Sequence, residues 1–342
     1  MKYILTIVAT NLLIITSLIG LLELSARYFL APINAASIFD DQSLRTRGRS
    51  FVEIHPERGF ALKPDFHNNL YKINSQGFRG DEFPTVLKDY KIILAMGEST
   101  TFGWEVNNQQ TYPAALMQQF SNNKLPSGNK ALVINAGIPS YTSSQTLLYL
   151  KEILLKKVIQ PDLVLVNIMW NDIWYSSIKN WHPDILIYQH PPAWLTWLTK
   201  HSRLVHWGIM GGNTETQLIN IENTAALNQY EKNLNDMVAV AQKNNTNIVF
   251  IEPPFDLDHM PEQGLGEFQV HYTKPFFMEQ AMKYRQVLHR VAKAQNISVI
   301  GHSLDLDTLH QKTLFLDLLH PTEEGNAIMA QDVYNALLAN KI

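Results

Sequence analysis

The chain of 342 residues contains no cysteine. Disulfide bonds and metal sites built on thiolates are therefore excluded, although this absence does not decide the compartment. Charged residues are also sparse, at 17% of the chain, with a formal net charge of -3 and no strongly basic segment. Because binding to nucleic-acid phosphates requires clustered Lys and Arg, we expect no nucleic-acid partner. The hydrophobic content of 46% favours a folded protein with a large core.

The longest stretch without a charged residue lies at the N-terminus, over 3–22. It is mostly apolar, and about 20 residues in a helix cover the roughly 30 Å hydrocarbon core of a bilayer. Lys2 precedes the stretch, which favours an N-terminus left in the cytoplasm. We therefore expect 1–27 to be a transmembrane signal anchor, with the rest of the chain on the periplasmic or extracellular side.

A cleaved signal peptide is the alternative interpretation of the same stretch. Cleavage requires a shorter apolar region followed by a small-x-small site. Residues 22–26 offer only a poor site of this kind. Several polar residues within the apolar run keep the alternative open: Thr6, Thr10, Asn11, Thr16 and Ser17.

Strand and helix patterns alternate from residue 91 onward, after a polar lead-in over 28–90 that shows no regular pattern. Apolar runs typical of strands cover 92–96, 131–137, 162–171, 247–252 and 297–300. Helical patterns cover 112–120, 143–158, 225–243, 276–294 and 323–339. Such alternation predicts an α/β protein with a mainly parallel sheet and helices on both faces, a three-layer α/β/α sandwich.

The segment 174–223 interrupts this alternation. It is rich in Trp and His: Trp181, Trp194, Trp197, Trp207, His182, His190, His201 and His206. It is either an apolar lid or acyl-binding wall over the active site, or an inserted helical subdomain or membrane-surface patch. The histidines lack the i, i+4 pairing or Cys partners of a zinc site, so we expect no metal and no cofactor.

Ser99, Gly137 and Asn171 each stand at the end of a strand-like run. The carboxyl ends of parallel strands share one edge of the sheet, where open α/β proteins bind ligands. Ser99 is therefore a candidate nucleophile. The N–H groups of Ser99 and Gly137, with the side-chain amide of Asn171, are candidates for an oxyanion hole. The structural alternatives are a helix N-cap at Ser99 and ordinary turn or cap roles for the other two.

A late motif reads Asp317-Leu-Leu-His320-Pro-Thr. Serine alone is a poor nucleophile and needs a base within hydrogen-bond reach, itself oriented by a third group. His320 is the candidate base and Asp317 the candidate orienting group. An α/β-hydrolase elbow is disfavoured, because it requires Gly-x-Ser-x-Gly and Thr101 occupies the second glycine position.

These blocks, in this order, resemble the SGNH hydrolases, also called the GDSL esterase/lipase family. The resemblance covers roughly 91–342 and matches Ser99, Gly137, Asn171 with Asp172, and Asp317 with His320 to the four blocks of the family. Two departures stand beside the matches. Glu98 occupies a position where the motif usually has Asp. Met169, which is followed by Trp170, occupies a position where the third block usually has Gly. The segment 73–80 resembles the lead-in of a membrane-anchored bacterial branch.

The resemblance implies a flavodoxin-like SGNH fold over 91–342, with Ser99, His320 and Asp317 as a catalytic triad. It predicts a membrane-anchored serine esterase that hydrolyses an acyl ester, with an acetyl group on an extracellular carbohydrate or a lipid ester as the expected substrate. The alternatives are an O-acyltransferase with the same triad, or a non-catalytic module of envelope or polysaccharide assembly. The acyl chain length, the alcohol moiety and the oligomeric state stay open.

Overall fold

The computed structural model describes residues 2–29, 51–122, 130–157, 159–177, 181–183, 198, 202–205, 222–256, 273–301, 303–304 and 314–339. These residues belong to two compact units. One unit comprises 1–50 with 189–217, and the other, which we call the catalytic unit, comprises 51–188 with 218–342. Each unit is described below by itself.

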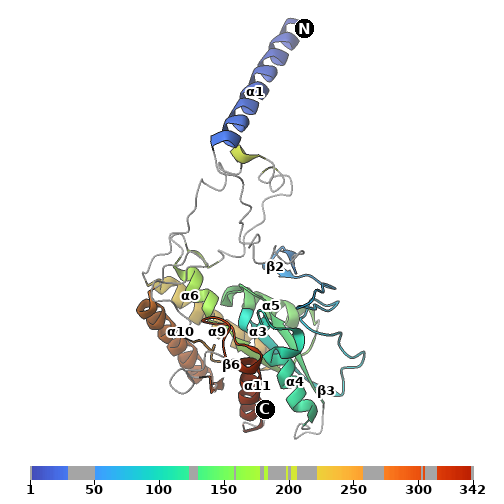
Figure 1. The fold of residues 1–342 in the computed structure, drawn as a ribbon, viewed down its shortest axis with the longest axis vertical. Helices are drawn as coiled ribbons and strands as arrows, with labels where there is room; N and C mark the ends of the chain where they lie inside the picture. Colours follow the sequence, from blue (N-terminus) through green and yellow to red (C-terminus); the bar gives the residue numbers. More distant parts are fainter. Residues whose placement is uncertain are drawn as a thin grey trace. The chain divides into compact units, whose positions relative to one another are not determined.

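The catalytic unit is built on a five-stranded parallel sheet in the order β4-β3-β5-β6-β7 (Figure 1). Its strands are β3 (Tyr90–Gly97), β4 (Lys130–Gly137), β5 (Leu163–Asn167), β6 (Asn247–Ile251) and β7 (Val299–Ile300). The apolar runs of β3, β4 and β5 are buried, as expected for parallel strands covered on both faces. Gly97 pairs with Gly137 on one side and with Asn167 on the other, so three strands end at the same level.

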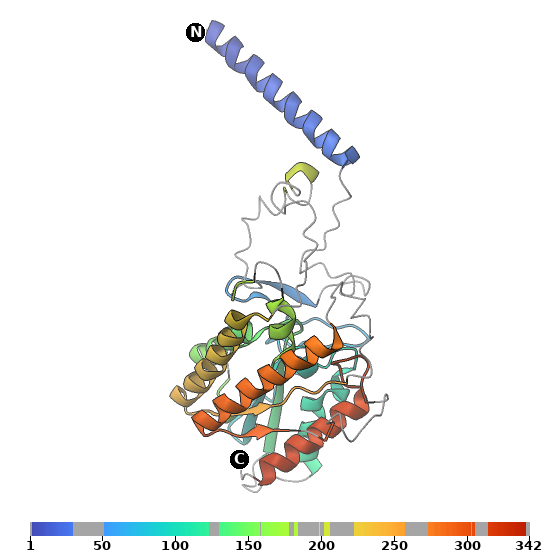
Figure 2. The same cartoon turned by 90° about the vertical axis from the view of Figure 1, so that its left-hand side faces the viewer.

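Helices surround the sheet. They are α3 (Ser99–Phe102), α4 (Tyr112–Asn122), α5 (Ser143–Lys156), α6 (Trp170–Ser176), α9 (Thr224–Lys243), α10 (Lys274–Gln295) and α11 (Glu323–Ala339), with a 3-10 turn at Asn108–Gln110. Helix α4 packs against α11, while α5, α9 and α10 form a second group (Figure 2). The predicted α/β sandwich with a mainly parallel sheet is confirmed.

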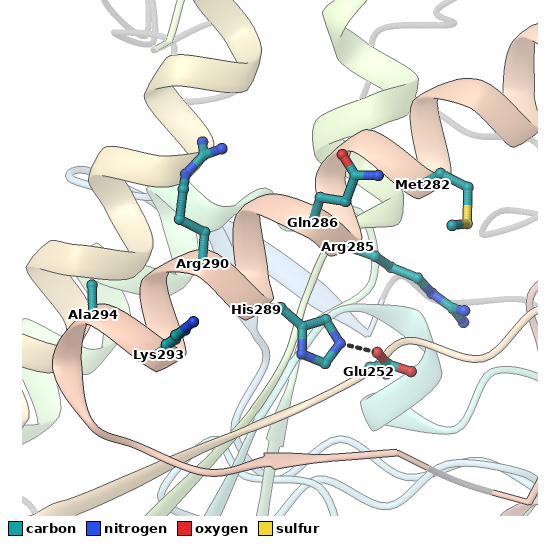
Figure 3. Close-up of a pocket in the computed structure, with 8 residues that line it drawn as sticks. All are labelled: Glu252, Met282, Arg285, Gln286, His289, Arg290, Lys293 and Ala294. Atoms are coloured by element: carbon teal, nitrogen blue, oxygen red, sulfur yellow. Dashed lines mark hydrogen bonds and ion pairs between the residues drawn. The ribbon is translucent and has the colours of Figure 1, made fainter.

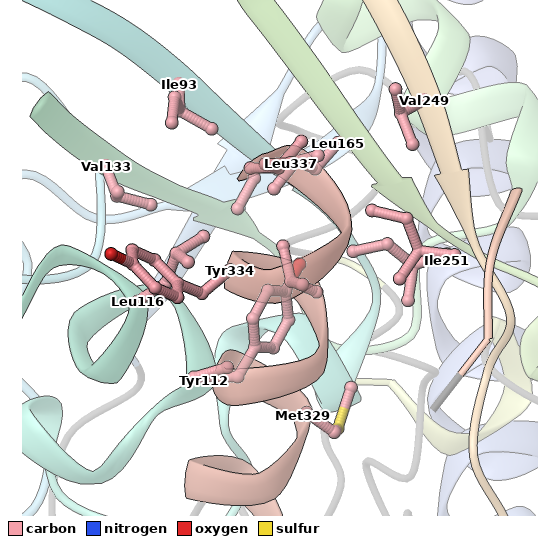
Figure 4. Close-up of a cluster of buried hydrophobic side chains, with 14 of the residues drawn as sticks. Ile93, Tyr112, Leu116, Val133, Leu165, Val249, Ile251, Met329, Tyr334 and Leu337 are labelled. Carbon is pink, nitrogen blue, oxygen red and sulfur yellow. The ribbon is translucent and has the colours of Figure 1, made fainter. Parts of the chain in front are cut away.

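The core under α4 and α11 shows why this face of the sheet is closed. Ile93, Val133 and Leu165 point from three neighbouring strands toward Tyr112 of α4 and Tyr334 of α11 (Figure 4). Side chains alternate along a strand, so the same register places Gly97 on this face at the carboxyl end of β3. Packing against α4 and α11 therefore fixes the position of β3, the strand that leads into Ser99.

The lead-in differs from the irregular segment expected over 28–90. Residues 51–90 contain an antiparallel hairpin of β1 (Val52–His55) and β2 (Gly59–Leu62), and bury several aromatic side chains: Phe51, Phe60, Phe66, Tyr71 and Phe78. The N–H of Arg79 donates to the carbonyl of Asn135 in β4 at 3.1 Å. The spacing of the aromatics follows no helix or strand period, which is why this packing could not be predicted from the sequence. Residues 30–50 lie outside the described residues.

The other unit contains one long helix, α1 (Lys2–Phe29). The part Thr6–Phe29 has a mean hydropathy of 2.1 and is long and apolar enough to cross a membrane, a test that a signal sequence also passes. Of the insertion expected over 174–223, residues 174–177 lie in or directly after α6. Trp181 and His182 are also described. The remaining Trp and His residues singled out there fall outside the described residues: Trp194, Trp197, Trp207, His190, His201 and His206.

Candidate active site

Ser99 begins α3 directly after β3 and lies within hydrogen-bond distance of His320. The distance from Ser99 Oγ to His320 Nε2 is 2.8 Å, and that from His320 Nδ1 to Asp317 Oδ2 is 2.6 Å. The structure thus joins two sequence motifs that are separated by 221 residues. The order of contacts is hydroxyl, imidazole and carboxylate, which is the order in which a nucleophile, its base and an orienting acid must stand.

The turn that carries His320 is held from several sides. Asp317 Oδ1 accepts hydrogen bonds from the N–H groups of Leu319 at 2.8 Å and His320 at 2.9 Å. The carbonyl of His320 accepts from the N–H of Leu316 at 2.8 Å. Gly325 then allows the chain to close, because a Cβ there would lie 2.3 Å from the carbonyl oxygen of Leu314. With the spacing Asp-x-x-His, one oxygen of Asp317 thus holds the backbone of the turn while the other holds the imidazole ring of His320.

The electrostatics of Asp317 favour its ionised form. Desolvation by burial raises the pKa of its carboxyl, but the hydrogen bond and charge of His320 and the N–H donors of the turn outweigh that effect. The pKa of Asp317 consequently lies below its usual value. A carboxylate at this place orients the His320 ring through the hydrogen bond to Nδ1.

Asn171 lies at the start of α6 with its amide held toward the same edge. Its Nδ2 donates to the carbonyl of Tyr141 at 3.0 Å. An amide nitrogen carries two hydrogens, so one remains for another acceptor. The N–H of Ser99 belongs to the first turn of α3, where backbone N–H groups have no partner within the helix. Both groups are candidate donors to an oxyanion formed at Ser99.

Gly137 lies at the expected edge but not with the expected free donor. Its N–H donates to Asn135 Oδ1 at 3.0 Å, so this hydrogen is already used. A Cβ on Gly137 would lie 2.2 Å from the backbone nitrogen of Phe102, which explains the glycine by the close approach of α3 to β4. The close approach explains why the chain needs a glycine at this position, and the oxyanion role expected for Gly137 stays a prediction.

Ser140 is a feature of this edge that the sequence pattern did not single out. It has a φ of 66° and directly precedes Tyr141, whose carbonyl holds the Asn171 amide. Non-glycine residues are uncommon in this left-handed region, and such conformations collect at functional sites. The only local sign in the sequence is the Pro-Ser pair at 139–140 between a strand and a helix.

A buried and a half-buried carboxyl group, those of Glu98 and Asp172, lie at the start of α6. Glu98, next to Ser99, accepts hydrogen bonds from the N–H groups of Met169 at 3.1 Å, Trp170 at 2.8 Å and Asn171 at 2.8 Å. Ser143 is the first residue of α5, and both its N–H, at 2.8 Å, and its hydroxyl donate to the carboxyl group of Asp172. Burial raises the pKa of Glu98 to about 8 and that of Asp172 to about 7, although the N–H donors oppose the rise. The Glu98 side chain thus links the nucleophile turn to the residue that carries the candidate oxyanion amide.

A buried arginine braces the other side of the nucleophile helix. Arg79 is 4% exposed and donates to the carbonyls of Phe102, Gly103 and Val106 and to Asn108 Oδ1. Burial lowers its pKa to about 9. The segment that the sequence presented as a lead-in therefore orders the loop directly behind Ser99.

Aromatic side chains flank the site. The ring of Trp104 lies 6.2 Å from that of His320, between centroids. Trp170, one of the departures from the family motif, is 3% exposed and stacks on Phe277 at 5.5 Å. Met169 is fully buried. Both bulky residues are thus part of the packing behind Asn171 and do not line an open pocket.

A groove of about 880 Å³ lies elsewhere in the catalytic unit, along α10 (Figure 3). Two of its basic side chains have carboxylate partners. His289 Nε2 contacts Glu252, and Arg290 contacts Glu231, which lies outside the groove. Neither Ser99 nor His320 lines it. Among the described residues, no three His, Asp or Glu side chains gather as metal ligands.

The sequence-family comparison agrees with this geometry. A family model described as "GDSL-like Lipase/Acylhydrolase family" matches residues 95–328, more than half of the chain. The chain belongs to this family. The match includes Ser99, Asn171, Asp317 and His320, so the residues brought together by the structure lie in the matched region. Members of the family are carboxylic ester hydrolases, and this is the enzyme class of the chain.

Solved structures of esterases resemble the chain at low sequence identity. They include a psychrotrophic esterase from Pseudoalteromonas sp. (14% identity, 73% of this chain and 98% of that chain, TM-score 0.45). Others are a lipase/acylhydrolase from Enterococcus faecalis (17%, 73% and 96%, 0.46) and a catalytic mutant of an acetylxylan esterase from Geobacillus stearothermophilus (18%, 72% and 93%, 0.44). No curated protein matches the chain.

Proposed function

We propose that this member of the GDSL-like family is a serine esterase in which Ser99 is the nucleophile. His320 accepts the hydroxyl proton as Ser99 attacks the acyl carbonyl, and returns it to the leaving alcohol. Asp317 holds the imidazole in the required tautomer and stabilises its protonated form. A water molecule, activated by His320 in the same way, then releases the acid and restores Ser99.

The developing oxyanion is stabilised by two donors in this proposal, the N–H of Ser99 and the side-chain amide of Asn171. Donors that are positioned before the reaction act where charge appears in the transition state, and each contributes roughly 10²- to 10³-fold in rate. The carbonyl of Tyr141 supports this role, because it fixes one hydrogen of the Asn171 amide and leaves the other for the oxyanion.

The observation that carries the proposal is the unbroken chain of contacts from Ser99 through His320 to Asp317, at 2.8 Å and 2.6 Å. An ordinary helix-capping serine has no need of a histidine on its hydroxyl. A non-catalytic envelope module likewise gives no reason for an imidazole whose two nitrogens contact a hydroxyl and a carboxylate.

The finer proposal concerns place and substrate. The apolar Thr6–Phe29 segment and the positively charged start support a single-pass anchor with the catalytic unit on the extracytoplasmic side. The resemblance to the membrane-anchored branch favours an acetyl ester on an extracellular carbohydrate. The ring of Trp104, which lies beside that of His320, limits the space at the site and supports a short acyl group.

A substrate panel tests the proposal with the full chain purified in detergent. The panel contains acyl esters of increasing chain length and acetylated sugars, each measured with the wild type and with Ser99→Ala. We expect turnover of short acyl esters by the wild type alone. Product analysis with an added sugar acceptor separates hydrolysis from acyl transfer. Equal turnover by Ser99→Ala on every ester would remove the esterase assignment.

Reporter fusions test the location separately. A reporter that is active only outside the cytoplasm, fused after Arg27, should be active and should remain with the membrane fraction. Cytoplasmic activity would contradict the orientation, and release of a mature chain that starts near Ala26 would replace the anchor by a cleaved signal.

A further inference from the structure

Glu23 is an acidic residue near the end of an otherwise apolar helix. In the candidate span Thr6–Phe29, the other charged residue is Arg27. A charged side chain in such a segment is costly unless it finds partners, so its presence calls for a physical reason. The structure shows such a reason. The described side chains of α1 are exposed except those of Glu23 and Ala26, so this one side of the helix is covered.

The covered side of α1 faces residues 202–205, which belong to the same unit. Glu23 Oε2 accepts from the hydroxyl of Ser202 at 2.6 Å and from the N–H of Leu204 at 3.1 Å, and its Oε1 accepts from the N–H of Arg203 at 2.9 Å. Ala26 is 6% exposed, one turn further along the same side of the helix. Both views of the structure show this short helical turn beside the end of α1 (Figures 1 and 2).

The cations at this junction complete the contact. Arg27 Nε donates to Glu23 Oε1 at 2.9 Å, and Arg203 Nη1 donates to the backbone carbonyl of Arg27 at 2.5 Å. The turn itself is closed by Ser202, whose hydroxyl also accepts from the N–H of Val205 at 3.1 Å. A single carboxylate therefore holds the start of the turn against the end of the apolar helix.

The depth of this junction follows from the sequence of α1. The twenty uncharged and mostly apolar residues 3–22 already cover the roughly 30 Å hydrocarbon core, so Glu23 falls at its boundary. Tyr28 and Phe29 follow, 83% and 79% exposed, where aromatic side chains favour the headgroup region. Arg27 and Arg203 bring two guanidinium groups to the same level, which suits the phosphates of lipid headgroups.

We propose that residues 202–205 form an interfacial element that Glu23 docks against α1 and that contacts phospholipid headgroups. The inference rests on the membrane anchoring proposed above. It assigns this part of the Trp-rich insertion to the bilayer surface, in place of a lid over the active site. Glu23 is then a docking residue, and the lipid surface is the partner of the turn.

The absence of cysteine from the chain makes the test direct, because one introduced thiol is labelled alone. The full chain carrying Val205→Cys with an environment-sensitive fluorophore is reconstituted in vesicles of phosphatidylcholine and phosphatidylglycerol. Quenching is measured with a spin-labelled lipid and with aqueous iodide. Leu198→Cys serves as a second element position, because the carbonyl of Leu198 accepts from the N–H of Ser202 at 2.8 Å. Leu13→Cys reports the anchor itself.

Glu23→Leu removes the carboxylate while it keeps the helix apolar. Thr16→Val is the matched control, since the Thr16 hydroxyl contacts only its own helix carbonyls at Leu12 and Leu13 among the bonds observed. Lost hydrogen bonds to a charged acceptor are worth about an order of magnitude in a docking equilibrium. We therefore expect Glu23→Leu to reduce lipid quenching at both element positions about tenfold and to raise iodide quenching, whereas Thr16→Val changes neither.

The outcomes separate the inference from the anchoring on which it rests. Lipid quenching at position 13 without quenching at 198 or 205 in the wild type would overturn the inference and leave the anchor standing. Unchanged lipid quenching at 205 in Glu23→Leu would overturn the docking role of Glu23. Absence of lipid quenching at position 13 would instead remove the membrane anchor, and the inference with it.

Discussion

Glu98 in the catalytic unit and Glu23 in α1 both accept several hydrogen bonds from one short segment, although the two regions otherwise differ. Each carboxylate accepts hydrogen bonds from donors at the start of a short helical segment, where the helix dipole favours negative charge. Glu98 is fully buried in the catalytic unit and no salt bridge of it is observed, whereas Glu23 is partly exposed and pairs with Arg27. In the catalytic unit the contact positions a reacting group. At the end of α1 it joins two distant parts of the chain.

The largest expected effects separate the two regions completely. Ser99→Ala and His320→Ala should each lower kcat by about 10⁴-fold or more, because the nucleophile and its base act as one unit. Asp317→Asn should lose less than Ser99→Ala, since the geometry and the oxyanion donors survive. Circular dichroism and membrane retention should stay unchanged in all three. Loss of membrane retention in Ser99→Ala would mean that the regions are not independent.

Asn171→Ala should lower kcat by roughly 10²- to 10³-fold and change KM little, because its amide acts chiefly on the transition state. Steady-state kinetics on a short acyl ester check this. A variant with raised KM and unchanged kcat would show that Asn171 binds the substrate and does not stabilise the oxyanion.

Glu98→Gln should lower kcat by up to about tenfold by disturbing the backbone that carries Asn171, since one buried hydrogen bond is worth about 1 kcal/mol. The NH₂ group of the introduced glutamine would face one of the three backbone N–H donors that Glu98 now accepts from, and that hydrogen bond would be lost. The effect should be absent in an Asn171→Ala background if Glu98 acts through Asn171. Glu23→Gln is the matched variant of the other region, and its esterase activity should stay within about twofold of the wild type. Equal losses in both variants would contradict the comparison.

Gly137→Ala should destabilise the catalytic unit by about 3 kcal/mol, because the added Cβ meets backbone atoms that do not move easily. Gly301→Ala is the control, since the nearest atom to its Cβ would lie 3.9 Å away. Thermal unfolding of both variants measures the difference. If Gly137→Ala were as stable as Gly301→Ala, the close approach of α3 to β4 would be wrong.

The pH dependence of stability has a definite sign for Glu98. Its pKa is raised from 4.5 to about 8 in the folded chain, so the folded state binds the proton more tightly than the unfolded state. The contribution of Glu98 to the free energy of unfolding therefore falls as the pH rises from about 4.5 to about 8. Glu98→Gln should show a shallower decline over that window in denaturant titrations. A steeper decline in the variant would reverse the assignment.

The sequence was most informative where the chemistry is carried by a few residues at strand ends. The apolar runs predicted the strands, although β5 ends at Asn167 and not at Asn171, which lies in α6. The order of motifs predicted that Ser99 and His320 would meet. Gly137 shows the limit of this kind of prediction. A glycine after a strand does not reveal whether its N–H is free to bind a ligand or whether packing requires the absence of a Cβ. The interactions of Arg79 and Glu98 could not be predicted either, since both depend on backbone groups from distant segments that have no sequence signature.

The most direct test of the central claim is covalent labelling of Ser99. A fluorophosphonate probe reacts with a serine that a neighbouring base has activated, and peptide mapping by mass spectrometry identifies the modified residue. We predict labelling of the full chain at Ser99 alone, with loss of labelling in His320→Ala although Ser99 is still present. Absence of labelling in the wild type, or equal labelling in His320→Ala, would contradict the account.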